Sequence, residues 1–352
     1  MARFLALLFI AGVCPAQTAL KPVEGDWIAH DFTFNSGEKL AALRLHYRTF
    51  GSPVRDPAGR TRNAVLIMHG TGGSGKQFLS EAFAGVLFGA GQPLDANRYY
   101  IILPDGIGHG DSSKPSDGLR ADFPHYDYDD MVRAQYLLIH DGLGIDHLRL
   151  VMGTSMGGMH TWVWGETYPD FMDALMPLAN APVEIAGRNR ICREMIIDAI
   201  RSDPEWNNGD YKGTLRGMYA AEDVLFMMTS SPLQLRKLAP TRDQADEYYR
   251  NKVKQRALET DPNDMLYAVE SSRDYNPAPN LGRIKAPLYA INSADDEVNP
   301  PELGILDREI KRVARGRYIL IPTSEETRGH GTHSRPAVWK EYLIELLAQS
   351  KP

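Results

Sequence analysis

The segment that most constrains the fold is 148–160, where an apolar run leads into Gly153-Thr-Ser-Met-Gly157 and then into helix-forming residues. This is a G-x-S-x-G motif between a predicted buried strand and a predicted helix. A serine on such a sharp turn has strained dihedral angles, and a side chain at Gly153 or Gly157 would clash with neighbouring backbone. The turn would lift the Ser155 hydroxyl out of the sheet, toward the positive end of the helix dipole. The pattern predicts that Ser155 is a nucleophile; the alternative is a serine that only caps the helix.

Apolar runs alternate with helical patterns along the chain, which predicts a mostly parallel β-sheet flanked by helices. The runs at 27–34 and 40–50 are typical of a hairpin, and buried strands are predicted at 64–68, 99–103, 148–152, 174–178, 286–291 and 317–321. Helices are predicted at 128–143, after the serine to about 168, at 301–312 and at 337–348.

The strand signal fades between 182 and 277, where the pattern becomes mostly helical. We therefore predict a sheet domain in two parts, 17–181 and 278–352, with a helical cap at 182–277 inserted between them.

Residues 1–16 have the layout of a cleavable signal peptide, with Arg3 before the apolar run 4–13 and a cleavage point before Gln17. The apolar run is too short to anchor the chain across a bilayer. We expect a secreted or periplasmic protein with no stable membrane anchor; the alternative is a buried N-terminal helix.

Composition limits the partners. The net charge is −6 and no long basic run occurs, so nucleic acid is not expected as a partner. After cleavage at Gln17 a single cysteine would remain, which excludes a cysteine-based zinc site and an internal disulfide. We expect neither a metal nor a cofactor, and the sequence does not indicate the oligomeric state.

A serine nucleophile needs a base and an acid that orients the base. The strand at 286–291 runs into a loop with Asp295 and Asp296, and the strand at 317–321 runs into a loop with His330 and His333. Parallel strands bring such loops to the edge where Ser155 lies. We prefer Asp296 because Asp296-Glu-Val-Asn-Pro300 has the spacing typical of acid loops, and His330 because two glycines give its ring room. Asp295 and His333 are the alternatives.

The oxyanion of acyl transfer needs N–H donors. The backbone N–H of Met156 is one candidate, and that of Thr71, in the loop after the strand at 64–68, is the second. The same loop matches a phosphate-binding pattern in Gly70-Thr-Gly-Gly-Ser-Gly-Lys76. However, Gln77 occupies the position of the Ser or Thr that binds Mg²⁺, so nucleotide binding is disfavoured.

Several longer motifs accompany the elbow: Gly153-Thr-Ser-Met-Gly-Gly-Met159, Asp122-Phe-Pro124, Ala199-Ile-Arg-Ser-Asp-Pro-Glu-Trp206 with Gly209-Asp-Tyr211, the Asp296 loop, and Gly329-His330. With them the chain resembles the α/β-hydrolase superfamily and, within it, the homoserine O-acetyltransferase family. The resemblance implies the α/β-hydrolase fold, with Ser155, Asp296 and His330 as nucleophile, acid and base. It also implies acetyl-CoA as acyl donor and an amino-acid hydroxyl as acceptor.

One cap segment departs from this family. Where such transferases carry an arginine expected to hold the amino-acid carboxylate, this chain reads Ala220-Ala-Glu-Asp-Val224, and Glu222 would repel a carboxylate. In addition, the signal peptide would send the protein to a compartment where acetyl-CoA is not available. From both departures we expect an exported serine hydrolase that cleaves an ester or related acyl bond of a small molecule through an acyl-enzyme. The alternative is an acyl-CoA-dependent O-acetyltransferase of the homoserine type. A remote third interpretation is a non-catalytic binding protein on the same fold.

Overall fold

The computed structural model describes residues 21–350, so the predicted signal peptide at 1–16 lies outside the described residues. Eight strands form one sheet in the order β1-β2-β4-β3-β5-β6-β7-β8. They are β1 (Val23–Thr33), β2 (Lys39–Phe50), β3 (Ala64–Met68), β4 (Tyr100–Pro104), β5 (Leu150–Thr154), β6 (Leu175–Leu178), β7 (Leu288–Ser293) and β8 (Gly316–Ile321). The β1–β2 and β2–β4 pairs are antiparallel and all other pairs are parallel, which confirms the mostly parallel sheet.

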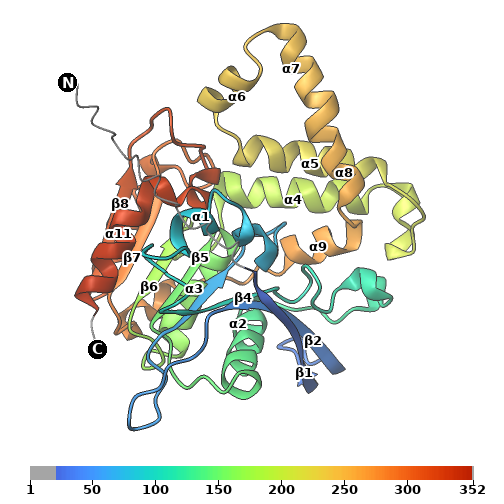
Figure 1. The fold of residues 1–352 in the computed structure, drawn as a ribbon. Coiled ribbons are helices and arrows are strands. Elements are labelled where there is room, and N and C mark those ends of the chain that lie inside the picture. The colour runs from blue at the N-terminus through green and yellow to red at the C-terminus, as the bar shows by residue number, and fades with distance from the viewer. Residues whose placement is uncertain (1–20, 351–352) are drawn as a thin grey trace, which may run out of the picture.

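The central strands form because they are apolar and covered on both faces. Every residue of β3, β5, β6 and β7 is buried, as a continuous apolar run in a parallel sheet should be. One apolar core packs α2 (Tyr128–Leu137) and α3 (Met156–Thr167) against the sheet. A second core packs α1 (Ala84–Leu87) and α11 (Pro336–Gln349) against the sheet. The sheet therefore lies between two helical layers (Figure 1).

Two predicted helices differ from the observed ones in length. The helix expected at 128–143 is α2, which begins at a capping box on Asp127 and continues as a π-helical turn at 138–142. The helix expected at 301–312 is broken by Gly304, whose φ of 59° lies in the left-handed region, so that only α10 (Ile305–Glu309) is α-helical there.

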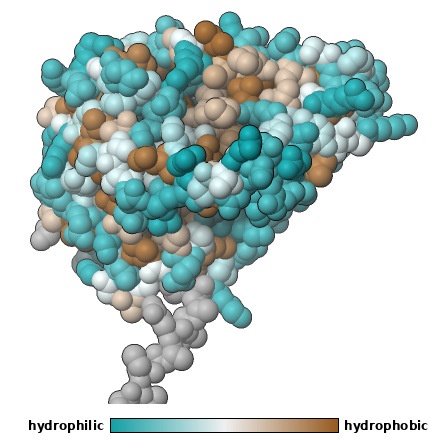
Figure 2. Space-filling model, turned by 90° about the horizontal axis from the view of Figure 1, so that it is seen from above, coloured by the Kyte–Doolittle hydropathy of each residue, from teal (hydrophilic) through white to brown (hydrophobic). Residues whose placement is uncertain are grey.

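The interval predicted as a cap contains six α-helices and no strand among its residues. They are α4 (Gly187–Arg201), α5 (Arg216–Thr229), α6 (Pro232–Leu238), α7 (Arg242–Tyr248), α8 (Lys254–Glu259) and α9 (Pro262–Glu270). In Figure 1 most of these helices, yellow to orange, stand above the sheet. They enclose an apolar core of their own, which includes Ile196, Met218 and Leu266. Seen from above in Figure 2, this side of the molecule shows apolar patches among hydrophilic ones.

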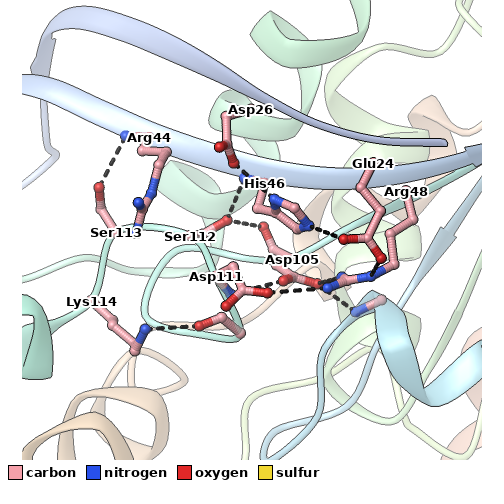
Figure 3. Close-up of polar contacts among 12 residues, drawn as sticks. Glu24, Asp26, Arg44, His46, Arg48, Asp105, Asp111, Ser112, Ser113 and Lys114 are labelled. Atoms are coloured by element: carbon pink, nitrogen blue, oxygen red, sulfur yellow. Dashed lines mark hydrogen bonds and ion pairs between the residues drawn. The ribbon is translucent and has the colours of Figure 1, made fainter.

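A buried arginine joins the β1–β2 hairpin to the loop after β4 (Figure 3). Arg48 is 3% exposed and contacts three carboxylates, those of Glu24 (3.1 Å), Asp105 (2.8 Å) and Asp111 (3.1 Å). Beside Arg48, the side chains of His46, Asp105 and Asp111 each offer an atom that could bind a metal ion, and these atoms lie within 4.8 Å of one another. Because the carboxylates of Asp105 and Asp111 already bind the Arg48 guanidinium, we interpret this group as a structural ion-pair network.

No helix within residues 21–350 combines the length and the apolar character that a membrane crossing requires.

Candidate active site

The sharp turn between β5 and α3 presents Ser155 at the edge of the sheet. Ser155 has φ 53° and ψ −114°, a strained conformation for a residue with a side chain, and its N–H donates to the Leu178 carbonyl in β6 (2.8 Å). A Cβ at Gly153 would overlap the Gly157 carbonyl, and a Cβ at Gly157 would overlap the Met68 carbonyl. Close backbone contacts therefore require both glycines, as the predicted clash of a side chain with neighbouring backbone implied.

The structure brings the three residues Ser155, His330 and Asp296 together, although 175 positions separate the serine from the histidine. The Nε2 atom of His330 lies 2.8 Å from Ser155 Oγ. The Nδ1 atom of His330 lies 3.0 and 3.1 Å from the two carboxylate oxygens of Asp296. Both supporting residues are buried, His330 at 6% exposure and Asp296 at 2%. The imidazole thus bridges a hydroxyl and a carboxylate.

The loop after β7 holds Asp296 as an anion. Its Oδ1 accepts backbone N–H groups of Val298 (2.8 Å) and Asn299 (3.3 Å), and its Oδ2 accepts the Asn299 amide (3.1 Å). Burial acts to raise the pKa of Asp296, but the nearby His330 and these hydrogen bonds outweigh burial and lower the pKa. The role of Asn299 was not predicted from the sequence, although an asparagine three residues after an aspartate in a loop suggests such a turn.

Asp295 has a different position from its neighbour. Its Oδ2 accepts hydrogen bonds from the Gly329 N–H (2.9 Å), the Thr327 hydroxyl (2.9 Å) and the Ser231 hydroxyl of the cap (3.2 Å). Its Oδ1 accepts from the Ser293 hydroxyl. This carboxylate therefore joins three segments of backbone, and it is Asp296 that contacts the imidazole.

His333, the alternative base, lies behind His330 and not beside the serine. The two imidazole rings have centroids 5.3 Å apart. Burial and the neighbouring His330 lower the pKa of His333 to about 3, so its ring is neutral at physiological pH. The ring makes no hydrogen bond to Ser155, whose described histidine partner is His330.

The backbone segments that carry the two predicted N–H donors lie next to Ser155. Met156 is the first residue of α3, so its N–H has no carbonyl partner within that helix. The loop with Thr71 also lies against the serine, since a Cβ at Gly70 would be 3.3 Å from the Ser155 Cβ. His69 braces this loop, with Nδ1 at 2.9 Å from the Gly70 carbonyl and Nε2 accepting the Gly106 N–H (2.9 Å). The loop and the start of the helix thus face one hydroxyl.

The cap segment with Glu222 is occupied by internal contacts. Glu222 is 2% exposed, lies 3.3 Å from the Arg256 guanidinium, and accepts a hydrogen bond from Thr260 (3.2 Å). Burial raises the pKa of its carboxyl, an effect that Arg256 partly offsets. This position therefore holds an ion pair internal to the cap.

Comparison with known proteins identifies the family to which the chain is similar. The sequence profile of the alpha/beta hydrolase fold matches residues 63–325. The homoserine O-acetyltransferase of Moorella thermoacetica is 36% identical over 211 residues, which cover 54% of this chain and 54% of that protein. The chain thus spans about half the length of that relative. The homoserine O-acetyltransferase of Haemophilus influenzae is 30% identical over 304 residues, which cover 76% of this chain and 82% of that protein.

Solved structures show the same fold. An acetylester hydrolase from Corynebacterium glutamicum superposes with a TM-score of 0.81 at 20% identity, over 93% of this chain and 96% of that chain. A homoserine O-acetyltransferase from Bacillus anthracis superposes with a TM-score of 0.76 at 21% identity, over 93% of this chain and 97% of that chain. At these identities the likeness establishes the fold alone.

Proposed function

This chain belongs to the α/β-hydrolase fold family, in its homoserine O-acetyltransferase-like branch, and from this premise we propose that it transfers an acyl group through an acyl-enzyme on Ser155. The leading form of the proposal is the O-acetyltransferase type, in which the acyl group passes from a thioester or ester donor to the hydroxyl of a small molecule. The observation that carries the acyl-enzyme is the 2.8 Å contact of His330 Nε2 with Ser155 Oγ, backed by Asp296, and the preference for transfer rests on the relatives.

In the proposed reaction His330 moves the proton. Its Nδ1–H donates to Asp296, which leaves Nε2 free to accept the Ser155 proton as the hydroxyl attacks the acyl carbon. The imidazolium that forms is stabilised by the Asp296 carboxylate and then protonates the leaving group. In the second half of the reaction, Nε2 takes a proton from the acceptor hydroxyl as its oxygen attacks the acyl carbon. The bond between the acyl carbon and Ser155 Oγ then breaks, and Oγ takes the proton back from His330.

We assign the backbone N–H groups of Met156 and Thr71 to the oxyanion. Both lie on backbone segments next to Ser155. N–H donors fixed in a site of low water content stabilise the developing charge of the tetrahedral intermediate, and removing one typically costs about 3 kcal/mol of activation free energy.

The acceptor decides between transferase and hydrolase. The named relatives are homoserine O-acetyltransferases, which favours a hydroxyl compound as acceptor. Hydrolysis, with water as acceptor, is the second candidate function. It is favoured by Glu222, which stands where the transferases are expected to carry an arginine and which is neutralised within the cap.

Two measurements test this proposal. A fluorophosphonate probe should label the wild-type protein and fail to label Ser155→Ala; equal labelling would contradict the assignment of the nucleophile. With p-nitrophenyl acetate or acetyl-CoA as donor, product analysis with and without homoserine measures the division of acetyl between acceptor and water. An excess of acetylated acceptor supports the transferase, and release of acetate alone supports the hydrolase.

We also propose that the protein is exported, on the basis of the signal-peptide layout of residues 1–16. N-terminal sequencing of protein recovered from the periplasm or medium of an expressing cell should give Gln17 as the first residue. Recovery of chains that begin at Met1 from the cytoplasm would contradict export.

A further inference from the structure

Among the residues that the structure describes, three arginines are at least nine-tenths buried: Arg48, Arg149 and Arg193. Arg48 contacts the carboxylates shown in Figure 3, and Arg149 lies 3.7 Å from the Asp173 carboxylate. Arg193, on α4 and 7% exposed, differs from both. Within residues 21–350, no ion pair within 4.0 Å includes its guanidinium. This side chain is a buried positive charge without a counter-ion.

The groups around Arg193 are neutral acceptors. Its Nε donates to the Asn189 side chain (3.0 Å) and its Nη1 to the Ser272 hydroxyl (2.9 Å). Its Nη2 donates to no atom of the described residues. A buried charge that is hydrogen-bonded but not neutralised is costly, so an arginine in this position favours an anion that arrives from outside the chain.

A buried phenol lies beside this arginine. Tyr128 is 2% exposed, and its hydroxyl has no hydrogen-bond partner among the described residues. Burial raises the pKa of the Tyr128 phenol, while Arg193, Thr71 and Ser272 lie close enough to offset part of the rise. The phenol is therefore a neutral donor, near both the guanidinium and the loop assigned to the oxyanion.

The position of Tyr128 connects this cluster to the nucleophile. Its ring packs edge-on against His160, with centroids 4.6 Å apart, one turn along α3 from Met156. Its ring also packs against Tyr275 at 5.7 Å, from the segment that follows α9. The Tyr128 hydroxyl and the Arg193 guanidinium, which has hydrogen-bond partners but no ion-pair partner, thus lie between the cap and α3, the helix that follows Ser155.

We propose that Arg193 and the Tyr128 hydroxyl form an anion subsite that binds a carboxylate on the hydroxyl-bearing part of the substrate. The inference deepens the proposed function and rests on it, because the bound carboxylate would place an acceptor hydroxyl or an ester alcohol at Ser155. The subsite lies on α4 and α2, whereas the arginine expected from the family resemblance falls on the α5 position now held by Glu222.

A carboxylate fits these groups better than a phosphate does. The guanidinium offers planar N–H donors that match a carboxylate, and the phenol offers one more. One carboxylate neutralises the single positive charge of Arg193, whereas a phosphate near neutral pH carries about two negative charges and would leave one of them buried.

The first test uses the unmodified enzyme. The probes are O-acetyl esters of glycolate, 3-hydroxypropanoate and 4-hydroxybutanoate, together with the primary amide of each. Three chain lengths are included because the chain between the carboxylate and the ester oxygen must match the distance from Arg193 to Ser155. We expect kcat/KM to be at least about ten-fold higher for the carboxylate than for its amide in one or more pairs. Equal rates in all three pairs would overturn the subsite.

The second test removes the charge. Arg193→Met should lower kcat/KM for the preferred carboxylate ester by about 10- to 100-fold, mainly through KM, because charge-assisted hydrogen bonds are lost. It should leave the amide and p-nitrophenyl acetate within about three-fold. Arg190→Met is the matched control, since Arg190 lies on the same helix and pairs with Glu194 (2.7 Å). If kcat/KM fell by the same factor for the carboxylate ester, its amide counterpart and p-nitrophenyl acetate, the role of Arg193 would be structural only.

A binding measurement separates failure of the subsite from failure of the proposed function. Titration calorimetry of the three hydroxy acids and of their amides into Ser155→Ala requires no turnover. Binding of at least one carboxylate but not of its amide, lost in Ser155→Ala/Arg193→Met, would support the subsite even if no ester were cleaved. If p-nitrophenyl acetate is turned over but none of these compounds binds, the catalytic proposal survives and the subsite does not.

Discussion

Replacing Asp296 by asparagine tests the proposed site at its most buried member. The Asp296 carboxylate accepts N–H groups from Val298, Asn299 and the His330 ring. An asparagine has one oxygen to accept hydrogen bonds and an NH₂ group that only donates. If the NH₂ group faces His330, Nδ1 must become the acceptor, and the proton then occupies Nε2.

The magnitude follows from this change of tautomer. An Nε2 that carries a proton cannot accept the Ser155 proton across the 2.8 Å contact. The loss of the base should lower kcat by about 10³- to 10⁴-fold, because no group then removes the proton of the Ser155 hydroxyl as it attacks. This corresponds to about 4–5.5 kcal/mol of activation free energy.

The matched control is the neighbouring residue. Asp295→Asn keeps an acceptor oxygen for the Gly329 N–H and Ser231 hydroxyl and leaves the imidazole contact intact. We expect this variant to retain kcat within about ten-fold and to lose about 1–3 kcal/mol of unfolding free energy, through weakened hydrogen bonds.

The assay compares p-nitrophenyl acetate turnover of the two variants, with circular dichroism to confirm that both are folded. The reasoning would be refuted if folded Asp296→Asn kept more than about a tenth of the wild-type kcat. It would also be refuted if Asp295→Asn lost as much activity as Asp296→Asn, because only one of the two carboxylates contacts the imidazole.

Two further predictions concern stability. Burial, together with Asp129, raises the pKa of Glu166 to about 7 from an ordinary value of 4.5. The unfolded chain therefore loses this proton at a lower pH than the folded chain does. The free energy of unfolding falls as the pH rises from about 4.5 to about 7. Urea unfolding of Glu166→Gln should therefore show a gain of up to about 3 kcal/mol at pH 8 and little change at pH 4; an equal gain at both would contradict the assigned titration. Gly157→Ala should lower the unfolding free energy by about 2–4 kcal/mol or prevent folding, because its Cβ would overlap the Met68 carbonyl, whereas Gly282→Ala, with no atom near its Cβ, should change it by less than about 1 kcal/mol.

The elements that the sequence predicted best are those whose pattern is local. β3 coincides with the predicted strand at 64–68, because five consecutive apolar residues can be buried on both faces only inside a parallel sheet. The elbow was also predictable, since the spacing of two glycines around Ser155 reflects contacts within a few residues. The convergence of Asp296 and His330 followed from strand direction alone.

What the sequence did not reveal depends on contacts between distant segments. The difference between Asp295 and Asp296 is set by Gly329 and Ser231, which lie 34 and 64 positions away from Asp295. Likewise, the burial of Arg193 without a carboxylate depends on Ser272, 79 positions along the chain. Helical periodicity places a residue on a face of its helix but does not identify the groups opposite that face.

These distant contacts also make the cap part of the catalytic framework. Ser231, between α5 and α6, and the N–H of Gly329 share the Oδ2 atom of Asp295, and His330 follows Gly329 directly. Gly329 has φ of 60°, and a Cβ there would lie 3.0 Å from the Ser230 carbonyl and 3.1 Å from the Asp295 carbonyl, so the backbone before His330 is held between the cap and the acid loop. Movement of the α5–α6 junction away from the sheet must therefore break the Ser231 hydrogen bond or displace the imidazole. Because proton transfer requires the 2.8 Å contact at Ser155, the position of the cap and the competence of the base are coupled.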